Sequence, residues 1–382
     1  MSKVDELIQD LCPNGVERVT LGDVITLNFG QRITKKANLG SLYPVYGGGG
    51  ESFRTDDYNR ENETVVSRFA MSEECVRTVQ EKFWLLDSGF TFTCNSEIAL
   101  HSFVTYALLA MQPRIYSCSS RSAQRNLKVP EFKRLRIPLP PLEVQEEIVR
   151  ILDQFVELDR ELEQEIPARE RQKFTMGSAL FDRLNSYPRL SLRDAGTWFG
   201  GGTPSKSNDS YWKNGTIPWV SPKDMQGHSV TRTTDYITEE AVEKSSTKLI
   251  PPGATALVTR SSILDKRLPI AFFPQTVTMN QDLKAILPNE EVNGRYLFNA
   301  LEQHRDGIRR LAHKKGGSAA SLDTNRLMSF EIPLPPLEVQ EEIAAKLDTF
   351  TEYIDNLKRE CELRQKQYEH YRDKLLDFEV KE

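Results

Sequence analysis

A twelve-residue phrase occurs twice in this chain without a single substitution. The letters IPLPPLEVQEEI run from Ile137 to Ile148 and again from Ile332 to Ile343, 195 positions later. Self-similarity at a fixed offset indicates that one structural plan is built more than once. The repeat therefore predicts two copies of one local geometry within a single chain.

Each copy of the phrase opens a helical pattern. Pro141 and Pro336 suit the first helical position, and the Ile-Pro-Leu-Pro before each should be extended. After each copy, apolar residues recur in alternating steps of four and three, which is typical of a coiled-coil seam. We expect two long helices that pair antiparallel, which gives the chain an approximate two-fold axis. The expected seam comprises Ile148, Leu152, Phe155 and Leu162 in the first helix, and Ile343, Leu347, Phe350, Ile354, Leu357, Tyr368 and Tyr371 in the second.

The first helix differs from the second in its later half. Pro167 lies inside it, and proline removes a backbone donor and clashes with the preceding turn. The sequence therefore predicts that the first helix kinks at Pro167 or ends early.

The repeat extends beyond the phrase and sets the domain organisation. RVTLGDV from Arg18 and RLSLRDA from Arg189 open the two halves, while the segments between are dissimilar. A chain of 382 residues is long enough for two domains plus connectors. We expect an α+β protein with two β-rich globular domains joined by the two helices. The expected segments are a first domain at 1–136, a first helix at 137–186, a second domain at 187–331 and a second helix at 332–382.

Charge alternates along these segments. The net charge is −5, yet Lys and Arg exceed Asp and Glu by four in 18–136 and again by four in 187–331. The helical segments 137–186 and 332–382 are each acidic by five. A mildly basic surface on both globular segments is compatible with a polyanionic partner such as DNA.

Several other classes of protein fit the sequence poorly. Five scattered cysteines indicate neither a disulfide framework nor a zinc site. The apolar run 98–111 is shorter than the roughly 18 residues that span a bilayer, and the acidic start lacks the apolar core of a signal peptide. These features predict a cytoplasmic protein with no membrane partner.

The glycine runs resemble nucleotide-binding loops only superficially. YGGGG at Tyr46 lacks the spacing of a dinucleotide fingerprint, and GGGTPSKS has Pro204 and Ser205 where a phosphate-binding loop needs a glycine before its lysine. Both runs are better interpreted as turns. The loop TPSKSNDSYWKNGTIPW carries Asn214-Gly215, a dipeptide typical of tight hairpins.

The motifs together resemble the specificity subunits of type I restriction-modification systems. The resemblance covers nearly the whole chain and rests on the opening MSKVDELIQDLCPNGVE, on NFGQRITKK with YPVYGGGG, on GGGTPSKSNDSYWKNGTIPWVSPKDM and above all on the twin IPLPPLEVQEEI helices. It implies two target-recognition domains that each read one half of a bipartite DNA sequence. It also implies helices that bind methyltransferase subunits, two in number, and restriction motor subunits within the complex. The partner subunits would use S-adenosylmethionine, ATP and Mg²⁺, and this chain would hold no cofactor or metal and perform no catalysis.

Candidate DNA contacts follow from residue chemistry. Lys and Arg position a protein on phosphates, while Arg, Lys, Asn and Gln reach base edges. The candidates of the first domain are Gln31, Arg32, Lys35, Lys36, Arg121, Gln124, Arg125 and Lys128, and those of the second are Lys206, Lys213, Lys223, Arg260, His313, Lys314 and Lys315. Two other functions remain open at this point: an enzyme with an active site between the domains, and a structural adaptor that does not bind DNA.

Overall fold

The structure is a computed structural model that describes residues 3–121, 124–314 and 320–381. The chain divides into two compact units. Unit 1 comprises residues 1–163 and 360–382, and unit 2 comprises residues 164–359. Each unit therefore contains one globular domain together with parts of both long helices.

The two long helices are nearly equal in length. Helix α7 spans Leu142–Asp182 and helix α12 spans Leu337–Leu375, which makes 41 and 39 residues. Of the two outcomes predicted at Pro167, a kink or an early end, the early end was wrong, because α7 continues through Pro167 to Asp182. Phe181, beyond the proline, is 3 % exposed in the core of unit 2, and such packing stabilises a helix more than local propensity does. No helix in the described ranges is both long and apolar enough to cross a membrane.

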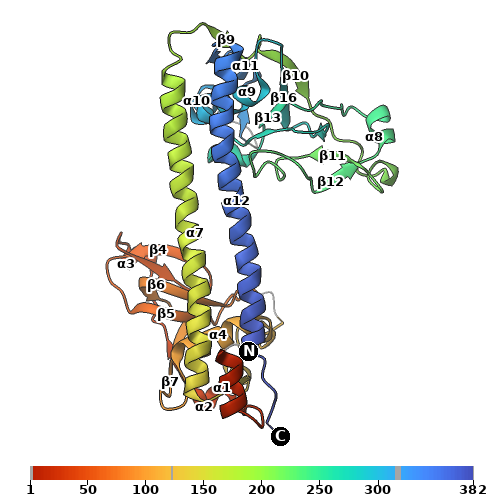
Figure 1. Ribbon diagram of the computed structural model, residues 1–382. Coiled ribbons are helices and arrows are strands. Elements are labelled where there is room, and N and C mark those ends of the chain that lie inside the picture. The colour runs from red at the N-terminus through yellow and green to blue at the C-terminus, as the bar shows by residue number, and fades with distance from the viewer. Residues whose placement is uncertain (1–2, 122–123, 315–319, 382) are drawn as a thin grey trace. The chain divides into compact units, whose positions relative to one another are not determined.

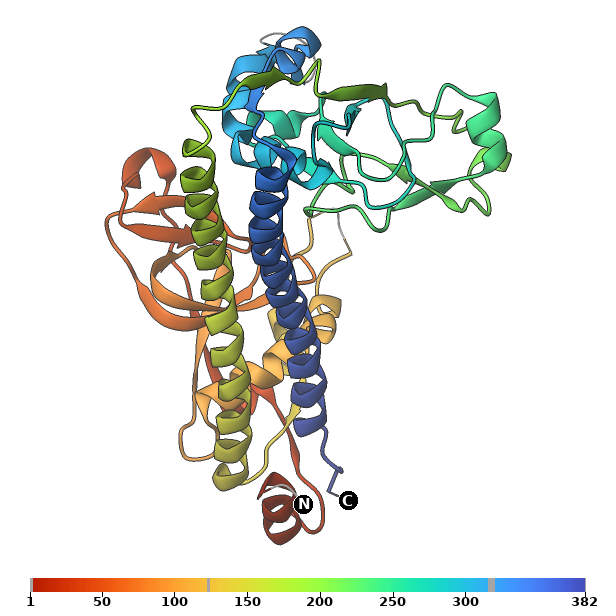
Figure 2. The same cartoon turned by 45° about the horizontal axis from the view of Figure 1, so that its top comes forward.

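Within each unit the long helices pack against each other in opposite directions (Figures 1 and 2). In unit 1, Ile148 and Leu152 near the start of α7 share a buried cluster with Leu376, just beyond the end of α12. In unit 2, Phe181 at the end of α7 shares a cluster with Leu347 near the start of α12.

The expected seam residues line this packing to different depths. Ile148, Leu152, Leu162, Ile343, Leu347, Ile354 and Leu357 are buried, and Phe155, Phe350 and Tyr368 are half-buried. Tyr371 is 38 % exposed and stacks on Phe155 with ring centroids 5.5 Å apart. Tyr371 therefore lies at the edge of the seam.

Unit 1 contains a six-stranded sheet in the order β2-β7-β5-β6-β3-β4. Its neighbours are antiparallel except β3 and β6, which are parallel. The strands are β2 (Ile25–Phe29), β3 (Tyr43–Tyr46), β4 (Glu51–Thr55), β5 (Arg60–Ser67), β6 (Val76–Leu85) and β7 (Gly89–Cys94). The helices are α1 (Lys3–Leu11), α2 (Leu21–Val24), α3 (Lys35–Asn38), α4 (His101–Ala110), α5 (Gln112–Ser117) and α6 (Val129–Lys133). Helix α4 buries Val104 and Leu108 against Phe90 and Phe92 of the sheet.

Unit 2 contains a four-stranded sheet in the order β10-β16-β13-β14 and a three-stranded sheet in the order β12-β11-β15. The strands are β10 (Gly196–Gly200), β11 (Ile217–Val220), β12 (Asp235–Ile237), β13 (Thr255–Val258), β14 (Ile270–Phe272), β15 (Thr278–Met279) and β16 (Leu283–Pro288). The helices are α8 (Glu239–Lys244), α9 (Gly294–Gln303), α10 (Arg305–Ala312) and α11 (Thr324–Met328), with the 3-10 helices η1 (Asp209–Tyr211) and η2 (Ser262–Asp265). Helix α9 packs on the four-stranded sheet as α4 does in unit 1. A short hairpin, β17 (His313–Lys314) with β18 (Ser321–Leu322), follows α10.

The start of each domain pairs with the start of its repeated phrase. Strand β1 (Arg18–Thr20) is antiparallel to β8 (Arg136–Pro138), with Val19 opposite Ile137. Strand β9 (Arg189–Ser191) is antiparallel to β19 (Glu331–Pro333), with Leu190 opposite Ile332. Both domains are therefore closed by the same two-stranded ladder before the chain enters a long helix.

The expected hairpin at Asn214-Gly215 was wrong. Asn214 has a positive φ of 58°, as a turn requires, but the element directly before it is the 3-10 helix η1 and not a strand. The antiparallel partner of β11 is instead the distant strand β12. Asn214-Gly215 instead turns the chain from η1 into β11. The dipeptide indicates a turn, but it does not specify which strands pair.

Candidate nucleic-acid interface

In each unit, a tryptophan side chain hydrogen-bonds the loop that follows one strand of the larger sheet, β2 in unit 1 and β10 in unit 2. In unit 1 the amide of Gln31 donates to the carbonyl of Leu85 at 2.8 Å, and the indole of Trp84 donates to the carbonyl of Gln31 at 2.8 Å. In unit 2 the amide of Gly202 donates to Met279 at 2.8 Å, and the indole of Trp219 donates to Gly202 at 3.0 Å. NFGQRI and GGGTPS therefore occupy equivalent positions in the two units, although their sequences differ.

These first loops need glycine for a steric reason. A Cβ on Gly30 would overlap the carbonyl oxygen of Leu86, and one on Gly201 would overlap that of Asn280. Glycine allows two backbone segments to approach this closely. Of the runs interpreted as turns, GGGTPSKS thus serves close backbone packing in unit 2, and Gly30 of NFGQRI does so in unit 1.

A second pair of loops also occupies equivalent positions. In unit 1 the loop 119–127 is attached by the amide of Leu127, which donates to Arg68 at 2.8 Å. In unit 2 the hairpin β17–β18 is attached by the amide of Leu322, which donates to Thr259 at 2.8 Å. Leu127 and Leu322 are 195 positions apart, as the repeated phrases are. The fold thus attaches Leu127 in unit 1 and Leu322 in unit 2 at equivalent positions.

The unit 1 candidates lie on three exposed segments. Arg125 is half-buried, and its guanidinium lies over the ring of Tyr116 at 4.5 Å. Lys128 forms an ion pair with Glu131 at 2.9 Å. The exposed candidates are Gln31, Arg32, Lys35 and Lys36, the last two in α3, and Arg121 and Gln124 in the loop 119–127.

Arg68, which sequence reasoning missed, joins two of these segments. Its guanidinium lies 5.0 Å from the ring centroid of Phe29 and 4.6 Å from that of Phe69. Phe29 immediately precedes Gly30 and Gln31, and the carbonyl of Arg68 accepts from Leu127. The loop beginning at Gly30 and the loop 119–127 are therefore neighbours. No local sequence signal distinguishes Arg68 from the other arginines, since the contact joins residues far apart in sequence.

The unit 2 candidates divide into paired and unpaired cations. Arg260 bonds to Asp282 at 2.6 Å, Lys213 to Asp209 at 2.6 Å and Lys314 to Asp323 at 3.5 Å. His313 faces Asp265 at 3.6 Å. Lys206 and Lys223 are exposed and have no ion-pair partner among residues 3–121, 124–314 and 320–381. Lys315 lies outside the described residues.

The structure brings Arg260 and the β17–β18 hairpin together. Arg260 forms a β-bridge with Ser321, and the amide of Ser261 donates to Ala320 at 3.0 Å. Asp282, the partner of Arg260, follows Asn280 and Gln281, which lie against Gly201 and Thr203. Arg260 thus links the strand β18 to the segment that packs against the glycine loop of unit 2.

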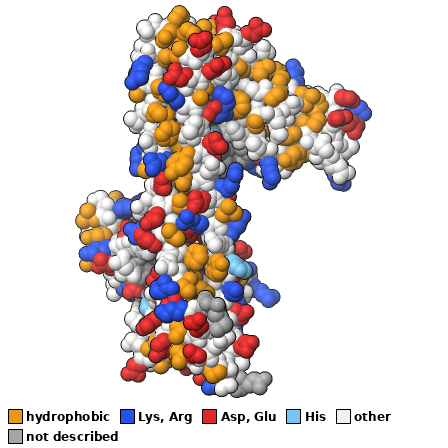
Figure 3. Space-filling view, viewed as in Figure 1, with side chains coloured by type: hydrophobic (Ala, Val, Ile, Leu, Met, Phe, Trp, Pro, Cys, Tyr) orange, Lys and Arg blue, Asp and Glu red, His pale blue; other side chains and the backbone are white. Residues whose placement is uncertain are grey.

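Charge on the visible surface is mixed (Figure 3). On the face shown, the described Lys and Arg side chains are interspersed with Asp and Glu on both units, with no broad area of one sign. Exposed ion pairs contribute little stability, so a phosphate can replace a carboxylate partner at modest cost. On this face the charges favour contacts at a few loops over a continuous basic track.

Unit 2 also contains a polar cavity of about 360 Å³. Lys173, His228, Glu302, Asp355 and Lys358 are among its lining residues. Asp355 pairs with His228 at 3.3 Å, and Lys358 pairs with Glu170 at 2.7 Å. No group of three or more His, Cys, Asp or Glu with the geometry of a metal site occurs in the described part of the chain.

Comparison with known proteins places the sequence in one context. A profile described as the type I restriction modification DNA specificity domain matches residues 13–169 and 190–363. A type I restriction enzyme specificity subunit from Escherichia coli is 46 % identical over 256 residues, which are 64 % of this chain and 63 % of that protein. A corresponding subunit from Methanocaldococcus jannaschii is 33 % identical over 49 % of this chain and 43 % of its own length. These two relatives are thus matched over less than two thirds of their length.

A solved structure shares the fold. The S subunit of a type I restriction-modification system from M. genitalium superposes with a TM-score of 0.62, covering 94 % of this chain and 96 % of that chain. The two sequences are 18 % identical, so the likeness concerns architecture. The α+β class, with two β-rich domains and two long packed helices, is confirmed.

Proposed function

This chain belongs to the type I restriction modification DNA specificity domain family, and we propose that it is the DNA-recognition subunit of such a system. In this proposal each globular domain reads one half of a bipartite sequence in double-stranded DNA. The loops 30–36 and 119–127 serve the first half-site. The loops 201–206 and 313–322, with Arg260, serve the second.

The observation that carries the proposal is the pair of equivalent loop sets. The long helices and the ladders β1–β8 and β9–β19 are repeated in the two units. The loops that these elements support differ in sequence. A repeated frame presents two domains to successive stretches of duplex, and divergent loops are what two different half-sites require. A structural adaptor would have no need of different loops at equivalent positions.

The partners follow from the family. We assign methylation to two methyltransferase subunits held by α7 and α12, and cleavage to restriction motor subunits. S-adenosylmethionine, ATP and Mg²⁺ would then be used by these partners, and the present chain would supply position and sequence choice. A cytoplasmic location is part of the same proposal.

Base-resolution mapping of methylated adenines in cells that carry this chain and its methyltransferase tests the proposal. We expect one bipartite sequence. Gln31→Ala with Arg32→Ala should relax the first half-site only, at about 1–3 kcal/mol for each bidentate base contact removed. If methylation required no bipartite sequence, or if the purified chain alone turned over a cofactor, an enzymatic function would be favoured instead.

Phosphate contacts are tested by a second variant. Lys206→Ala with Lys223→Ala should weaken binding by the assembled complex without changing the methylated sequence. The slope of log affinity against log salt should fall by about 0.9 for each phosphate that the variant no longer neutralises. Lys346→Ala is the matched control, because Lys346 on α12 pairs with Glu342 of the same helix. A changed sequence preference in the Lys206/Lys223 variant would contradict a phosphate role.

A further inference from the structure

The repeated phrase attaches each long helix to a helix of its own domain through a buried glutamine. The Gln145 side-chain oxygen accepts from the amide of Leu100 at 2.9 Å, and its nitrogen donates to the carbonyls of Ile98 at 2.9 Å and Pro140 at 2.8 Å. Leu100 is the N-cap residue of α4. The long helix thus binds the first turn of the helix that supports the sheet.

Gln340 makes the same three bonds in unit 2. Its oxygen accepts from the amide of Asn293 at 2.8 Å, and its nitrogen donates to Glu291 at 2.9 Å and Pro335 at 2.8 Å. Asn293 is the N-cap residue of α9. Both glutamines are fully buried, so a shift that breaks these bonds leaves polar atoms without partners, which is costly.

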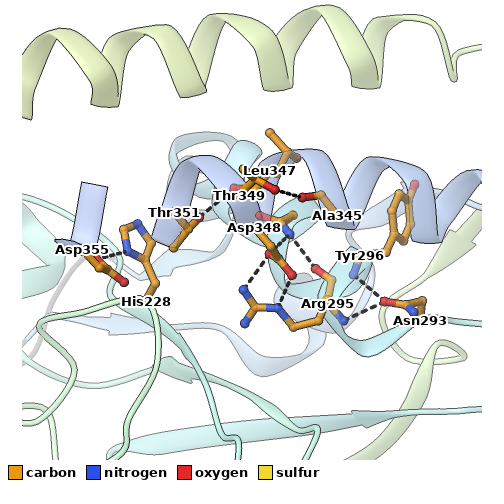
Figure 4. A network of polar contacts seen from close by, with 11 residues as sticks. His228, Asn293, Arg295, Tyr296, Ala345, Leu347, Asp348, Thr349, Thr351 and Asp355 are labelled. Atoms are coloured by element: carbon orange, nitrogen blue, oxygen red, sulfur yellow. Dashed lines mark hydrogen bonds and ion pairs between the residues drawn. The ribbon is translucent and has the colours of Figure 1, made fainter. Parts of the chain in front are cut away.

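A second attachment lies eight residues further along each long helix. Asp153 accepts a hydrogen bond from the hydroxyl of Tyr106 on α4 at 2.5 Å. Asp348 accepts from Arg295 on α9 at 2.6 and 2.7 Å (Figure 4). It also accepts from Asn299 at 2.9 Å. Asp153 and Asp348 are 195 positions apart, and their partners Tyr106 and Asn299 each lie six residues after the N-cap residues Leu100 and Asn293.

Two attachments fix the orientation of a domain on its long helix, which one attachment would leave free. Eight helical residues separate them by about 12 Å at 1.5 Å per residue. A domain held at the glutamine alone could pivot about it, whereas a second bond at this distance opposes rotation and tilt. The bidentate geometry of Arg295 with Asp348 adds directional restraint.

The restraint reaches the recognition loops through packed elements. Helix α4 packs on β6 and β7, and α9 packs on β13, β14 and β16. Strand β7 begins at the turn that holds Gly30 and Gln31, and β16 begins at the turn that holds Gly201 and Gly202. The angle between a long helix and its domain therefore sets where the loops of that domain lie relative to the helix.

We propose that Gln145 with Asp153, and Gln340 with Asp348, are positioning residues that hold each recognition domain at one angle on its long helix and thereby set the separation of the two half-sites. This inference rests on the proposed function. The partners differ between units while the glutamine and aspartate do not. The helix thus accepts any domain that offers an N-cap amide and a donor in the second turn.

The test uses the assembled methyltransferase complex and variants of the second attachment. Tyr106→Phe removes one hydroxyl from unit 1, and Asp348→Ala removes the carboxylate from unit 2. We expect each variant to keep both half-site sequences but to methylate sites whose spacer is one base pair longer or shorter at least tenfold more than the wild type does. Glu342→Ala is the matched control, because it removes an exposed carboxylate of α12 whose ion-pair partner among the described residues is Lys346 of the same helix.

Restoration of the ion pair distinguishes positioning from folding. Asp348→Arg alone should broaden the range of spacer lengths that are methylated. Asp348→Arg with Arg295→Asp should narrow that range again, since the ion pair is re-formed with reversed charges. Unchanged spacer selectivity in Tyr106→Phe and Asp348→Ala would overturn the inference. So would a loss of methylation in Asp348→Arg that the reversed pair does not recover. If the wild-type complex methylated no bipartite sequence, the proposed function would fail instead.

Discussion

Gly201 lies so close to Asn280 that a Cβ on Gly201 would overlap the Asn280 carbonyl oxygen, whereas a Cβ on the adjacent Gly200 would meet nothing within 4 Å. The amide of Asn280 donates in turn to the carbonyl of Val220 at 2.9 Å. The glycine loop of unit 2 is therefore packed against the connection between β15 and β16.

Gly201→Ala should destabilise unit 2 by about 1–3 kcal/mol, because backbone on both sides of the contact has to move. It should also reduce methylation at targets with the correct second half-site and leave the choice of the first half-site unchanged. Urea unfolding and methylation mapping measure the two effects. Gly200→Ala is the control and should change stability by about 0.5 kcal/mol or less. Equal effects of the two substitutions would show that the close approach is not what requires glycine.

Glu147 predicts a pH dependence for unit 1. Its carboxylate, 4 % exposed, bonds to Arg150 at 2.6 Å and to Lys3 at 2.9 Å. Hydrogen bonds from Arg150 and Lys3 lower the pKa of Glu147 from 4.5 to about 2. Because the folded pKa is depressed, this stabilisation is full above about pH 4.5 and is lost as pH falls towards 2.

Glu147→Gln should therefore be less stable than the wild type at neutral pH, and the difference should shrink between pH 4.5 and pH 2. The measurement is the free energy of unfolding as a function of pH. Glu146→Gln removes the same charge from an exposed neighbouring residue and should run parallel to the wild type. A constant difference between wild type and Glu147→Gln across this range would refute the assignment.

Lys173 occupies a seam position of α7 that corresponds to Tyr368 of α12, 195 positions later. Tyr368 packs in unit 1, whereas Lys173 faces the 360 Å³ cavity of unit 2. Burial lowers the pKa of Lys173, which means that the folded state disfavours its charged form. Lys173→Met should thus raise the stability of the chain at pH 7 by about 1 kcal/mol.

The gain from Lys173→Met should diminish as pH rises from the depressed folded pKa towards 10.5, because the wild type then loses the proton that burial penalises. Thermal unfolding of both proteins at several pH values measures this. Lys266→Met, at an exposed position, is the control and should show no such trend. A destabilising Lys173→Met would indicate that the ammonium contributes favourable interactions.

The long helices are expected to act as the ruler between half-sites. Seven residues added after Leu162 and after Leu357 keep the seam in phase and lengthen each helix by about 10 Å at 1.5 Å per residue. The spacer should grow by roughly three base pairs at 3.4 Å per pair, with both half-sites unchanged. Methylation mapping decides, and insertion into one helix alone is the control, since it puts the two seams out of register. Retention of the original spacer by the double insertion would show that something else sets the distance.

Local features of the sequence determined the two long helices, the α+β class and the duplicated plan. Proline at the first helical position and apolar residues in steps of four and three act within a few turns, so they can be recognised without the fold. The exact repeat gave the positions of the helices, and α7 and α12 begin one residue after Pro141 and Pro336. Local signals were insufficient where tertiary packing competes with them, as at Pro167, which α7 passes through, and at Asn214-Gly215, where no hairpin forms.

Only the tertiary structure decided what the repeated residues bind and which loops stand together. Gln145 meets Leu100 and Asp348 meets Arg295 across 45 and 53 positions of sequence, and Arg68 joins the loop after Gly30 to the loop ending at Leu127. Such contacts follow no periodic pattern in the sequence, because residues at any distance along the chain can become neighbours when a domain folds. The sequence shows that both copies share a glutamine, Gln145 or Gln340, and an aspartate, Asp153 or Asp348, at equivalent positions. It does not show which residues they bind. Their partners were set by where α4 and α9 pack on their sheets, and that packing depends on each domain as a whole.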